Sequence, residues 1–249
     1  MLELKNISKK FATKEVLNNI TLNIKEKEII SLLGESGSGK STLLNIIAGF
    51  EQANTGIMLY QNKTIFSDTI FYEPEKRNIG FVFQNYALFP HLNIAKNISF
   101  GISKESKSIQ KKRVSHLLKL IDMEGFEKKY PHQISGGQQQ RVAIARVLAR
   151  ESDLILFDEA FSSIDTTLKL KLIFQIKEII KSQGKTAIFV THDPKEALLL
   201  SDRIAYVEDG KIIQFDTPMQ LHKNPISKSV SDLFGEESFM FKNISELVQ

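Results

Sequence analysis

The residues Gly34-Glu35-Ser36-Gly37-Ser38-Gly39-Lys40-Ser41 lie between two regular patterns in the sequence. The apolar run Ile29-Ile30-Ser31-Leu32-Leu33 precedes them and predicts a buried strand. The run from Thr42 to Ala48 has helical spacing and stops at Gly49. A glycine-rich loop between a strand and a helix is the context in which GxxxxGK[ST] binds phosphate. The stretch therefore predicts a phosphate-binding loop.

Each residue type in this loop has a physical role. Gly34, Gly37 and Gly39 allow tight turns that point successive N–H groups inward, toward an anion. The start of the following helix adds partial positive charge at the same place. Lys40 can reach the β- and γ-phosphates, and the Ser41 hydroxyl can bind Mg²⁺. The sequence predicts that the chain binds a nucleoside triphosphate.

Length and composition are those of an ordinary globular protein of one or two domains: 249 residues, 42% apolar and 25% charged. The chain has no cysteine, which excludes disulfides and cysteine metal sites. The net charge of +4 is spread along the chain, so a nucleic-acid surface is not expected, whereas an anionic membrane surface is compatible with it. Neither a transmembrane helix nor an export signal is expected, because no long apolar run occurs.

The N-terminal residues predict two strands. Alternating apolar residues indicate a strand over residues 2–7, followed by Ser8 to Phe11 leading into a turn, and a second strand over 15–24. Phe11 has two interpretations at this point. It can stack on a purine base, or it can be a half-buried aromatic residue on an edge strand.

A glutamine and a helical segment follow. Residues 78–83 predict a buried strand that ends at Gln84, where the side chain can touch Mg²⁺ or an attacking water, or can simply lie in a loop. Residues 85–150 show helical patterns only and predict a helical lobe inserted into an α/β core. The lysines of residues 104–113 indicate the solvated face of a surface helix.

The sequence Ser135-Gly136-Gly137-Gln138 begins a strongly periodic helix. Two glycines and a serine at a helix start form a second anion site without a lysine. Because one chain needs only one phosphate loop, this second site suggests that two chains share a nucleotide. A plain helix N-cap is the alternative.

Two further strands end in polar residues. Residues 154–157 predict a buried parallel strand that ends in Asp158 and Glu159. The first carboxylate can hold Mg²⁺, and the second can orient or deprotonate the attacking water. Residues 186–191 predict another buried strand, after which His192 is placed to contact a γ-phosphate.

In this order, the motifs resemble those of the ATP-binding subunits of ABC transporters. Residues 34–41 are similar to Walker A, Gln84 to the Q-loop, 135–138 to the signature, 154–158 to Walker B and 163–165 to the D-loop. The resemblance also implies that Phe11 stacks on adenine. The nucleotide-binding residues that it implies are Phe11, Val16, Gly34, Glu35, Ser36, Gly37, Ser38, Gly39, Lys40, Ser41, Thr42, Gln84, Ser135, Gly136, Gly137, Gln138, Asp165 and His192.

The resemblance implies a mechanism in which two copies close head-to-tail over two ATP molecules. Glu159, His192 and Lys40 are then the catalytic residues, and Mg²⁺ is held by Ser41, Gln84 and Asp158. Three departures from the family pattern remove no catalytic group: Ile134 at the start of the signature, Ala160 after the glutamate, and Ser-Ser-Ile-Asp in the D-loop.

The resemblance also implies partners and a location. We expect membrane permease subunits, an indirect link to a substrate-binding protein, no nucleic acid, and a peripheral position on the cytoplasmic face of the inner membrane. Residues 83–92 and 48–51 look most like ferric iron importers, with polyamine, sulfate/thiosulfate and molybdate importers as alternatives. A force-transmitting ATPase of the cell-division type and a soluble ABC ATPase are alternatives of another class.

The expected fold is α/β, a P-loop NTPase core with a mainly parallel sheet, an N-terminal antiparallel β-subdomain and an inserted helical lobe. We expect residues 1–84 and 151–214 to form the RecA-like core with its β-subdomain, and residues 85–150 to form the helical subdomain. Residues 215–249 are too few for a full regulatory domain and predict a short C-terminal extension.

Overall fold

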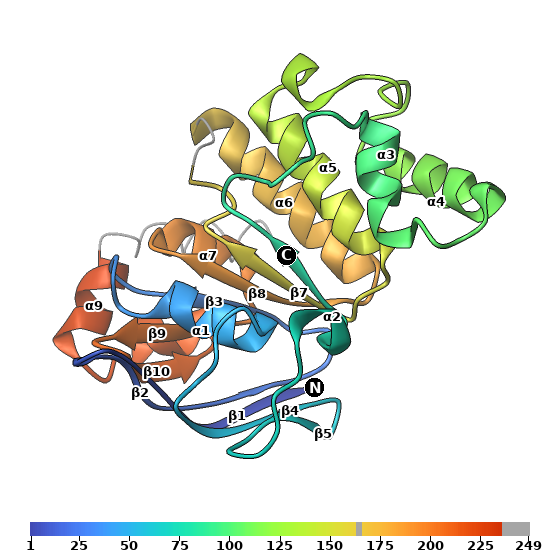
Figure 1. Cartoon of the computed structure of the whole chain (residues 1–249). Helices are drawn as coiled ribbons and strands as arrows, with labels where there is room; N and C mark the ends of the chain where they lie inside the picture. Colours follow the sequence, from blue (N-terminus) through green and yellow to red (C-terminus); the bar gives the residue numbers. More distant parts are fainter. Residues whose placement is uncertain (163–165, 236–249) are drawn as a thin grey trace. The chain divides into compact units, whose positions relative to one another are not determined.

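The computed structural model describes residues 1–162 and 166–235, which form two compact units. The first unit contains residues 1–77 and the described residues from 188 onward, and the second unit contains residues 78–187. Figure 1 labels the helices and strands of both units.

An antiparallel sheet forms the N-terminal part of the first unit (Figure 1). Its strands, in the spatial order β2-β1-β4-β5, are β2 (Lys14–Ile24), β1 (Leu2–Phe11), β4 (Thr55–Tyr60) and β5 (Lys63–Phe66). The predicted end of the first strand at residue 7 is wrong, because β1 continues to Phe11, and the predicted turn follows it. The pairing of β1 with β2 shifts register three times, and such bulges break the two-residue alternation from which the strand end was predicted.

The same unit contains a second sheet, whose strands in this unit have the order β10-β9-β3-β8. They are β3 (Ile29–Leu33), β8 (Thr186–Thr191, beginning in the second unit), β9 (Arg203–Glu208) and β10 (Lys211–Asp216). All residues of β3 and β8 are buried, which explains why their sequences are continuous apolar runs rather than alternating ones. The helices of this part are α1 (Lys40–Ala48), α2 (Pro74–Arg77) and α7 (Pro194–Leu200).

The second unit combines a parallel strand pair with helices (Figure 1). Strands β6 (Ile79–Val82) and β7 (Leu154–Asp158) pair in parallel. The helices are α3 (Ile94–Ser99), α4 (Lys107–Leu120), α5 (Gly136–Ala149) and α6 (Thr166–Ser182), with 3₁₀ turns at 100–102 and 131–133. Residues 85–150 contain only helices, turns and irregular segments, as their periodicity predicted.

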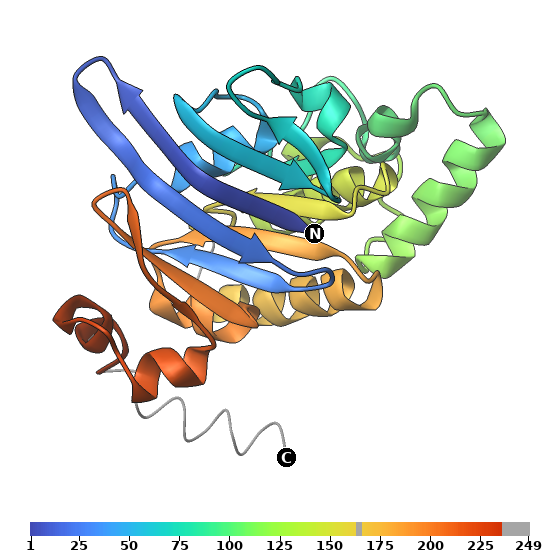
Figure 2. The same cartoon turned by 90° about the horizontal axis from the view of Figure 1, so that it is seen from below.

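The described part of the C-terminal extension, residues 215–235, forms two short helices after β10, α8 (Pro218–Lys223) and α9 (Lys228–Gly235), which Figure 2 shows side by side. Leu221 of α8 and Val230 of α9 are fully buried in one cluster with Leu33, Ala197 and Tyr206. Helices α8 and α9 are therefore part of the core of the first unit, because their apolar residues pack on the end of β3 and on α7.

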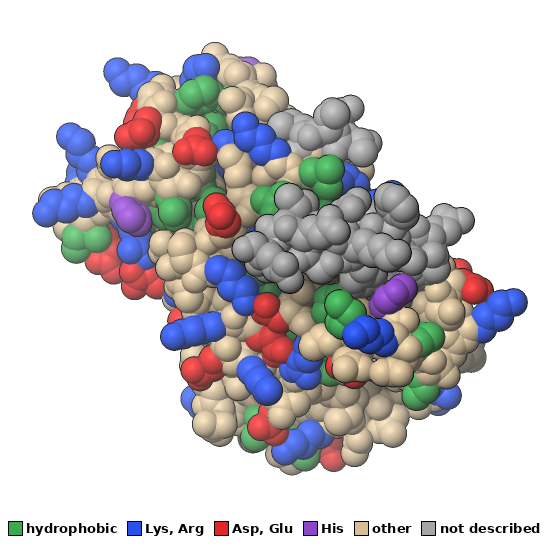
Figure 3. Space-filling model, turned by 180° about the vertical axis from the view of Figure 1, so that it is seen from behind, with side chains coloured by type: hydrophobic (Ala, Val, Ile, Leu, Met, Phe, Trp, Pro, Cys, Tyr) green, Lys and Arg blue, Asp and Glu red, His purple; other side chains and the backbone are tan. Residues whose placement is uncertain are grey.

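Charged side chains of both signs are interspersed on the face seen in Figure 3, among the residues drawn in colour. This mixture is usual for a globular protein surface. None of the described helices is long and apolar enough to cross a membrane.

Candidate functional site

The Lys40 side chain is held inside the loop that precedes α1. Its ammonium donates hydrogen bonds to the carbonyl oxygens of Gly34 at 2.8 Å and Glu35 at 2.6 Å, and to Ser38 Oγ at 3.3 Å. Lys40 is only 4% exposed, so these oxygens compensate the burial of its charge. The loop therefore curls around its own lysine, with the positive end of α1 beside it.

Two glycines are required by the packing of this loop. Gly39 has φ +100°, and a Cβ there would lie 2.7 Å from the carbonyl oxygen of Val16. A Cβ at Gly34 would overlap the carbonyl oxygen of Val207 on β9. Any larger side chain at either position would push the loop away from β2 or β9, so the two strands set the position of the loop.

Phe11 is the last residue of β1, and Val16 lies in β2, after the turn that joins the two strands. Phe11 is 45% exposed. Val16, through its carbonyl, lies against Gly39 of the loop. The residues that the sequence predicts for the base and for the phosphates therefore belong to one contiguous part of the first unit.

His192 is exposed in a turn that hydrogen bonds fix on both sides. The Thr191 hydroxyl donates to Glu196 at 2.6 Å and accepts from the Asp193 amide at 3.0 Å. Asp193 in turn caps α7 through the Lys195 amide at 2.9 Å. These contacts hold the backbone on either side of the histidine at the end of β8.

A cavity of about 570 Å³ brings His192 together with Gly34 and Glu35 of the phosphate loop. Its other lining residues were not predicted from the sequence. They are Tyr206 and Glu208 of β9 and four residues of α9: Lys228, Ser229, Asp232 and Leu233. Burial, helped by the negative charge of Glu208 and Glu35, raises the pKa of Tyr206, so its hydroxyl stays neutral. No spacing rule links β9 or α9 to the loop, since only the fold brings them there.

In the second unit, Gln84 and Glu159 are brought together although 75 residues separate them. The Gln84 side-chain nitrogen lies 3.4 Å from Glu159 Oε2 and 3.3 Å from Ser162 Oγ. The Ser162 hydroxyl donates to the Glu159 carbonyl at 2.9 Å. Glu159 has φ +45° and directly follows Asp158, the last residue of β7, so the chain turns sharply at the end of this strand.

The sequence Ser135-Gly136-Gly137-Gln138 forms the start of α5 with a capping box. Ser135 Oγ accepts from the Gln138 amide at 3.4 Å, and Gln138 Oε1 accepts from the Ser135 amide at 3.0 Å. The plain N-cap interpretation thus describes the local structure correctly. Gly136 is exposed, has no positive φ, and a Cβ there would meet nothing within 4 Å among the described residues.

The residues predicted to hold Mg²⁺ are a hydroxyl, an amide and a carboxylate: Ser41 in the first unit, and Gln84 and Asp158 in the second. Oxygen ligands of this kind fit Mg²⁺. The described residues contain no cluster of three or more His, Cys, Asp or Glu residues that could hold a metal by themselves. The predicted D-loop, with Asp165, lies outside the described residues.

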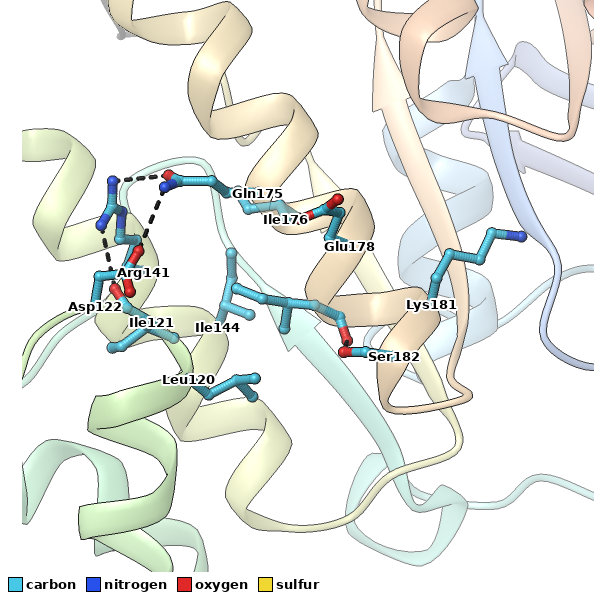
Figure 4. Close-up of a pocket in the computed structure, with 11 residues that line it drawn as sticks. Leu120, Ile121, Asp122, Arg141, Ile144, Gln175, Ile176, Glu178, Lys181 and Ser182 are labelled. Atoms are coloured by element: carbon cyan, nitrogen blue, oxygen red, sulfur yellow. Dashed lines mark hydrogen bonds between the residues drawn. The ribbon is translucent and has the colours of Figure 1, made fainter. Parts of the chain in front are cut away.

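A second cavity, of about 550 Å³, lies in the second unit between the end of α4, α5 and α6 (Figure 4). At one end, Arg141 of α5 donates to Gln175 Oε1 at 2.8 Å and to the Ile121 carbonyl at 3.2 Å. Gln175 in turn donates to Asp122 at 3.5 Å. This chain of contacts ties α6 to the helix that begins at the Ser135 cap.

A strand, a lysine-filled phosphate loop and a helix, with carboxylates at the end of a parallel strand, define the chain as an α/β P-loop nucleotide-binding protein. Residues 17–162, more than half of the chain, match the model of the ABC transporter family, and the chain belongs to this family. It is an ATP-binding cassette and an ABC-type ATPase, and the predicted fold class is confirmed.

Solved structures of ABC cassettes are similar to this chain. The ATP-binding cassette MJ0796, solved as a dimer in a post-hydrolysis state bound to ADP and Pi, is 36% identical, with a TM-score of 0.75 over 87% of this chain and 98% of that one. A second dimeric structure of MJ0796, described as a bacterial ABC transporter cassette, matches equally. CbiO1 from Clostridium perfringens, part of the ABC transporter complex CbiONQ, is 27% identical, with a TM-score of 0.83 over 99% and 98% of the two chains.

Proposed function

We propose that the chain is the ATPase subunit of a bacterial ABC importer, in which two copies close head-to-tail over two Mg²⁺-ATP molecules. In each site, Phe11 and Val16 would hold the adenine and Gly34–Thr42 the phosphates. Ser135–Gln138 and Asp165 of the second copy would complete the site. Ser41, Gln84 and Asp158 would hold Mg²⁺, which neutralises charge on the phosphates.

Glu159 would orient or deprotonate the attacking water, while Lys40 and His192 would stabilise the γ-phosphate. The 3.4 Å contact with Gln84 supports this role for Glu159, since it ties the carboxylate to a predicted Mg²⁺ ligand. The cavity that His192 shares with Gly34 and Glu35 supports its role in the same way.

The observation that supports a nucleotide site shared by two copies is the open space around Gly136. Within the described part of the chain, no backbone strain and no close contact requires glycine at this exposed position. Glycine is costly at helix positions where alanine would fit. An approaching ligand that leaves no room for a Cβ accounts for it, and a phosphate bound to the other copy is such a ligand.

A membrane permease would dock on aromatic side chains of the second unit. The Phe89 and Phe100 rings lie 4.3 Å apart between centroids, the Arg146 guanidinium lies 5.6 Å from the Phe89 ring, and Phe100 is 51% exposed. Arg146 also donates to the carbonyl of Ala87 at 2.6 Å, and so holds the segment after Gln84 against α5. An exposed aromatic group with a cation beside it suits a short helix of a partner.

Co-purification tests this proposal. The tagged chain, recovered from detergent-solubilised native membranes, should carry a permease with many membrane spans. Phe100→Ser should lose the permease and keep the ATPase activity of the isolated chain. Phe174→Ser on α6, which alters an equally exposed phenylalanine, is the matched control and should keep the permease. A partner with few spans, or none, would contradict the importer and favour force transmission or a soluble ATPase.

Ferric iron is the cargo that we propose, on the resemblance of residues 83–92 and 48–51 to iron importers. Nucleotide-binding domains do not contact the cargo, so the test uses the complete transporter. Uptake of ⁵⁵Fe into vesicles that contain the permease and its binding protein should depend on ATP and on Glu159. Stimulation of the ATPase by a polyamine, sulfate or molybdate binding system instead would contradict iron. The chain would lie at the cytoplasmic face of the inner membrane, bound to the permease.

A further inference from the structure

Lys9 of β1 is a lysine that is almost completely buried. It is 9% exposed, and its ammonium donates to Glu51 Oε1 at 2.6 Å and to the Gln52 carbonyl at 2.7 Å. Lysine is rarely buried unless it is paired, because its charge loses the solvation of water. The neighbouring Lys10 shows the usual behaviour, with a side chain that is 59% exposed.

The buried ammonium of Lys9 also lies over the ring of Phe11, 4.7 Å from the ring centroid. The two residues are two positions apart on β1, and this contact shows that their side chains lie together although the register shifts between Lys9 and Lys10. The residue Phe11 as a whole nevertheless remains 45% exposed. One side of Phe11 therefore carries a fixed cation, and a large part of its surface is available to a ligand.

We propose that Lys9 positions Phe11 for stacking on the base of the bound nucleotide. This inference rests on the proposed role of Phe11 in adenine binding. A ring that is already held by a cation–π contact loses less side-chain freedom when the base arrives. The cation also withdraws electron density from the ring, which weakens the repulsion between two stacked π-systems.

The partners of Lys9 connect the base site to the phosphate loop. Glu51 and Gln52 lie just after Gly49 and Phe50, which follow α1, the helix that begins at Lys40. The same segment is bound to β1 on both sides of Lys9, since the Asn54 amide donates to the Ser8 carbonyl at 2.8 Å and Asn54 Oδ1 accepts from the Lys10 amide at 2.6 Å. Lys9, which contacts the stacking ring, is thus bound to the segment after α1, and the phosphate loop precedes the same helix.

The test compares ATP with inorganic tripolyphosphate, which carries the phosphates without a base. Calorimetric affinities for both ligands would be measured at one Mg²⁺ concentration for the wild type, Lys9→Met, Lys9→Arg, Phe11→Ala and the double variant Lys9→Met/Phe11→Ala. Lys9→Met should weaken ATP binding roughly 2- to 5-fold and leave tripolyphosphate binding unchanged. Lys9→Arg keeps a cation at the ring and should restore ATP affinity. Lys10→Met, which removes an exposed charge one residue away, is the matched control and should change neither ligand.

The double variant identifies the path of the effect. If Lys9 acts through Phe11, then Lys9→Met should weaken ATP binding no further in the Phe11→Ala background. The inference would be overturned if Lys9→Met lost equal affinity for ATP and for tripolyphosphate. It would also be overturned if Lys9→Met bound ATP as tightly as the wild type while Phe11→Ala bound ATP more weakly. An unchanged ATP affinity in Phe11→Ala would instead remove the stacking role itself, and the role of Lys9 with it.

Discussion

The side-chain nitrogen of Gln84 lies 3.4 Å from a carboxylate oxygen of Glu159, so the turn after β6 and the turn after β7 meet at these two side chains. Both residues follow strands of a parallel pair, and the carboxyl ends of such strands share one edge. A change at either residue can therefore be made without disturbing a strand or a helix.

Glu159→Gln should abolish hydrolysis and preserve ATP binding. A glutamine side chain keeps an oxygen that can accept from Gln84, while it loses the ability to take a proton. We expect phosphate release to fall about 100-fold or more, as for loss of a general base. Light scattering at saturating Mg²⁺-ATP should then show an accumulated dimer. A monomeric Glu159→Gln chain beside a normally active wild type would contradict the shared site.

Gly136→Ala should separate stability from activity. Alanine is favoured over glycine in helices by up to about 1 kcal/mol, and a Cβ at this position meets no described atom within 4 Å, so thermal unfolding should not move to lower temperature. The ATPase rate should nevertheless fall, because the Cβ would obstruct the phosphate of the other copy. Ser135→Ala is the comparison, since loss of the cap should lower stability by about 1 kcal/mol. Full activity in Gly136→Ala would count against the shared site.

Arg77→Met should destabilise the first unit strongly. Arg77 is 2% exposed and donates to the carbonyls of Ile46 at 2.7 Å and Ile47 at 2.9 Å in the last turn of α1, and to Tyr72 at 2.7 Å. Burial lowers its pKa to about 10, so it remains charged at neutral pH. Loss of these bonds leaves buried carbonyls unsatisfied and should cost about 3 kcal/mol in chemical unfolding. Arg150→Met, at an exposed arginine, should cost little, and equal losses would refute this explanation.

The pair formed by Glu28 and Arg203 predicts loss of stability in acid. Burial alone would raise the pKa of Glu28, but hydrogen bonds from Arg203 at 2.5 Å and from the Lys25 amide at 2.8 Å outweigh it and hold this pKa below its ordinary value of 4.5. A carboxylate with a lowered pKa stabilises the fold above its unfolded pKa, and this stability is lost as the pH falls through the folded pKa.

Glu28→Gln should therefore lower the thermal unfolding midpoint at pH 7. The difference from the wild type should shrink as the pH falls below 4.5 and through the folded pKa of Glu28. Glu3→Gln alters an exposed pair with Lys5 and is the matched control, expected to cost less than about 1 kcal/mol. An equal difference between Glu28→Gln and wild type at pH 7 and pH 3 would show that the stability does not come from the charge.

The sequence predicts those parts of the site whose residues lie close to one another along the chain. The loop from Gly34 to Ser41 needs its residue types at fixed spacing, and the cap at Ser135 and Gln138 needs two residues three positions apart. The ladder of β1 was harder to predict, because its register shifts remove the alternation on which strand recognition depends.

Contacts between distant residues gave no signal in the sequence. Lys9 and Glu51 are 42 residues apart, and the wall that α9 adds beside His192 comes from the far end of the chain. No periodicity or motif links Lys9 to Glu51 or His192 to α9, because these partners meet only when whole sheets and helices have packed. A lysine in a polar stretch looks like any surface lysine until its burial is known.

The ammonium of Lys40 already occupies the centre of its own loop, bound to two peptide carbonyls and a hydroxyl. An incoming molecule has to compete with these three internal oxygens for the same cation. Neutral groups, such as the sugar of a nucleoside, offer nothing stronger than what the lysine holds, whereas clustered phosphate oxygens carry full negative charge. The loop therefore selects its ligands by charge. It binds polyphosphates and does not bind the nucleosides that carry the same base.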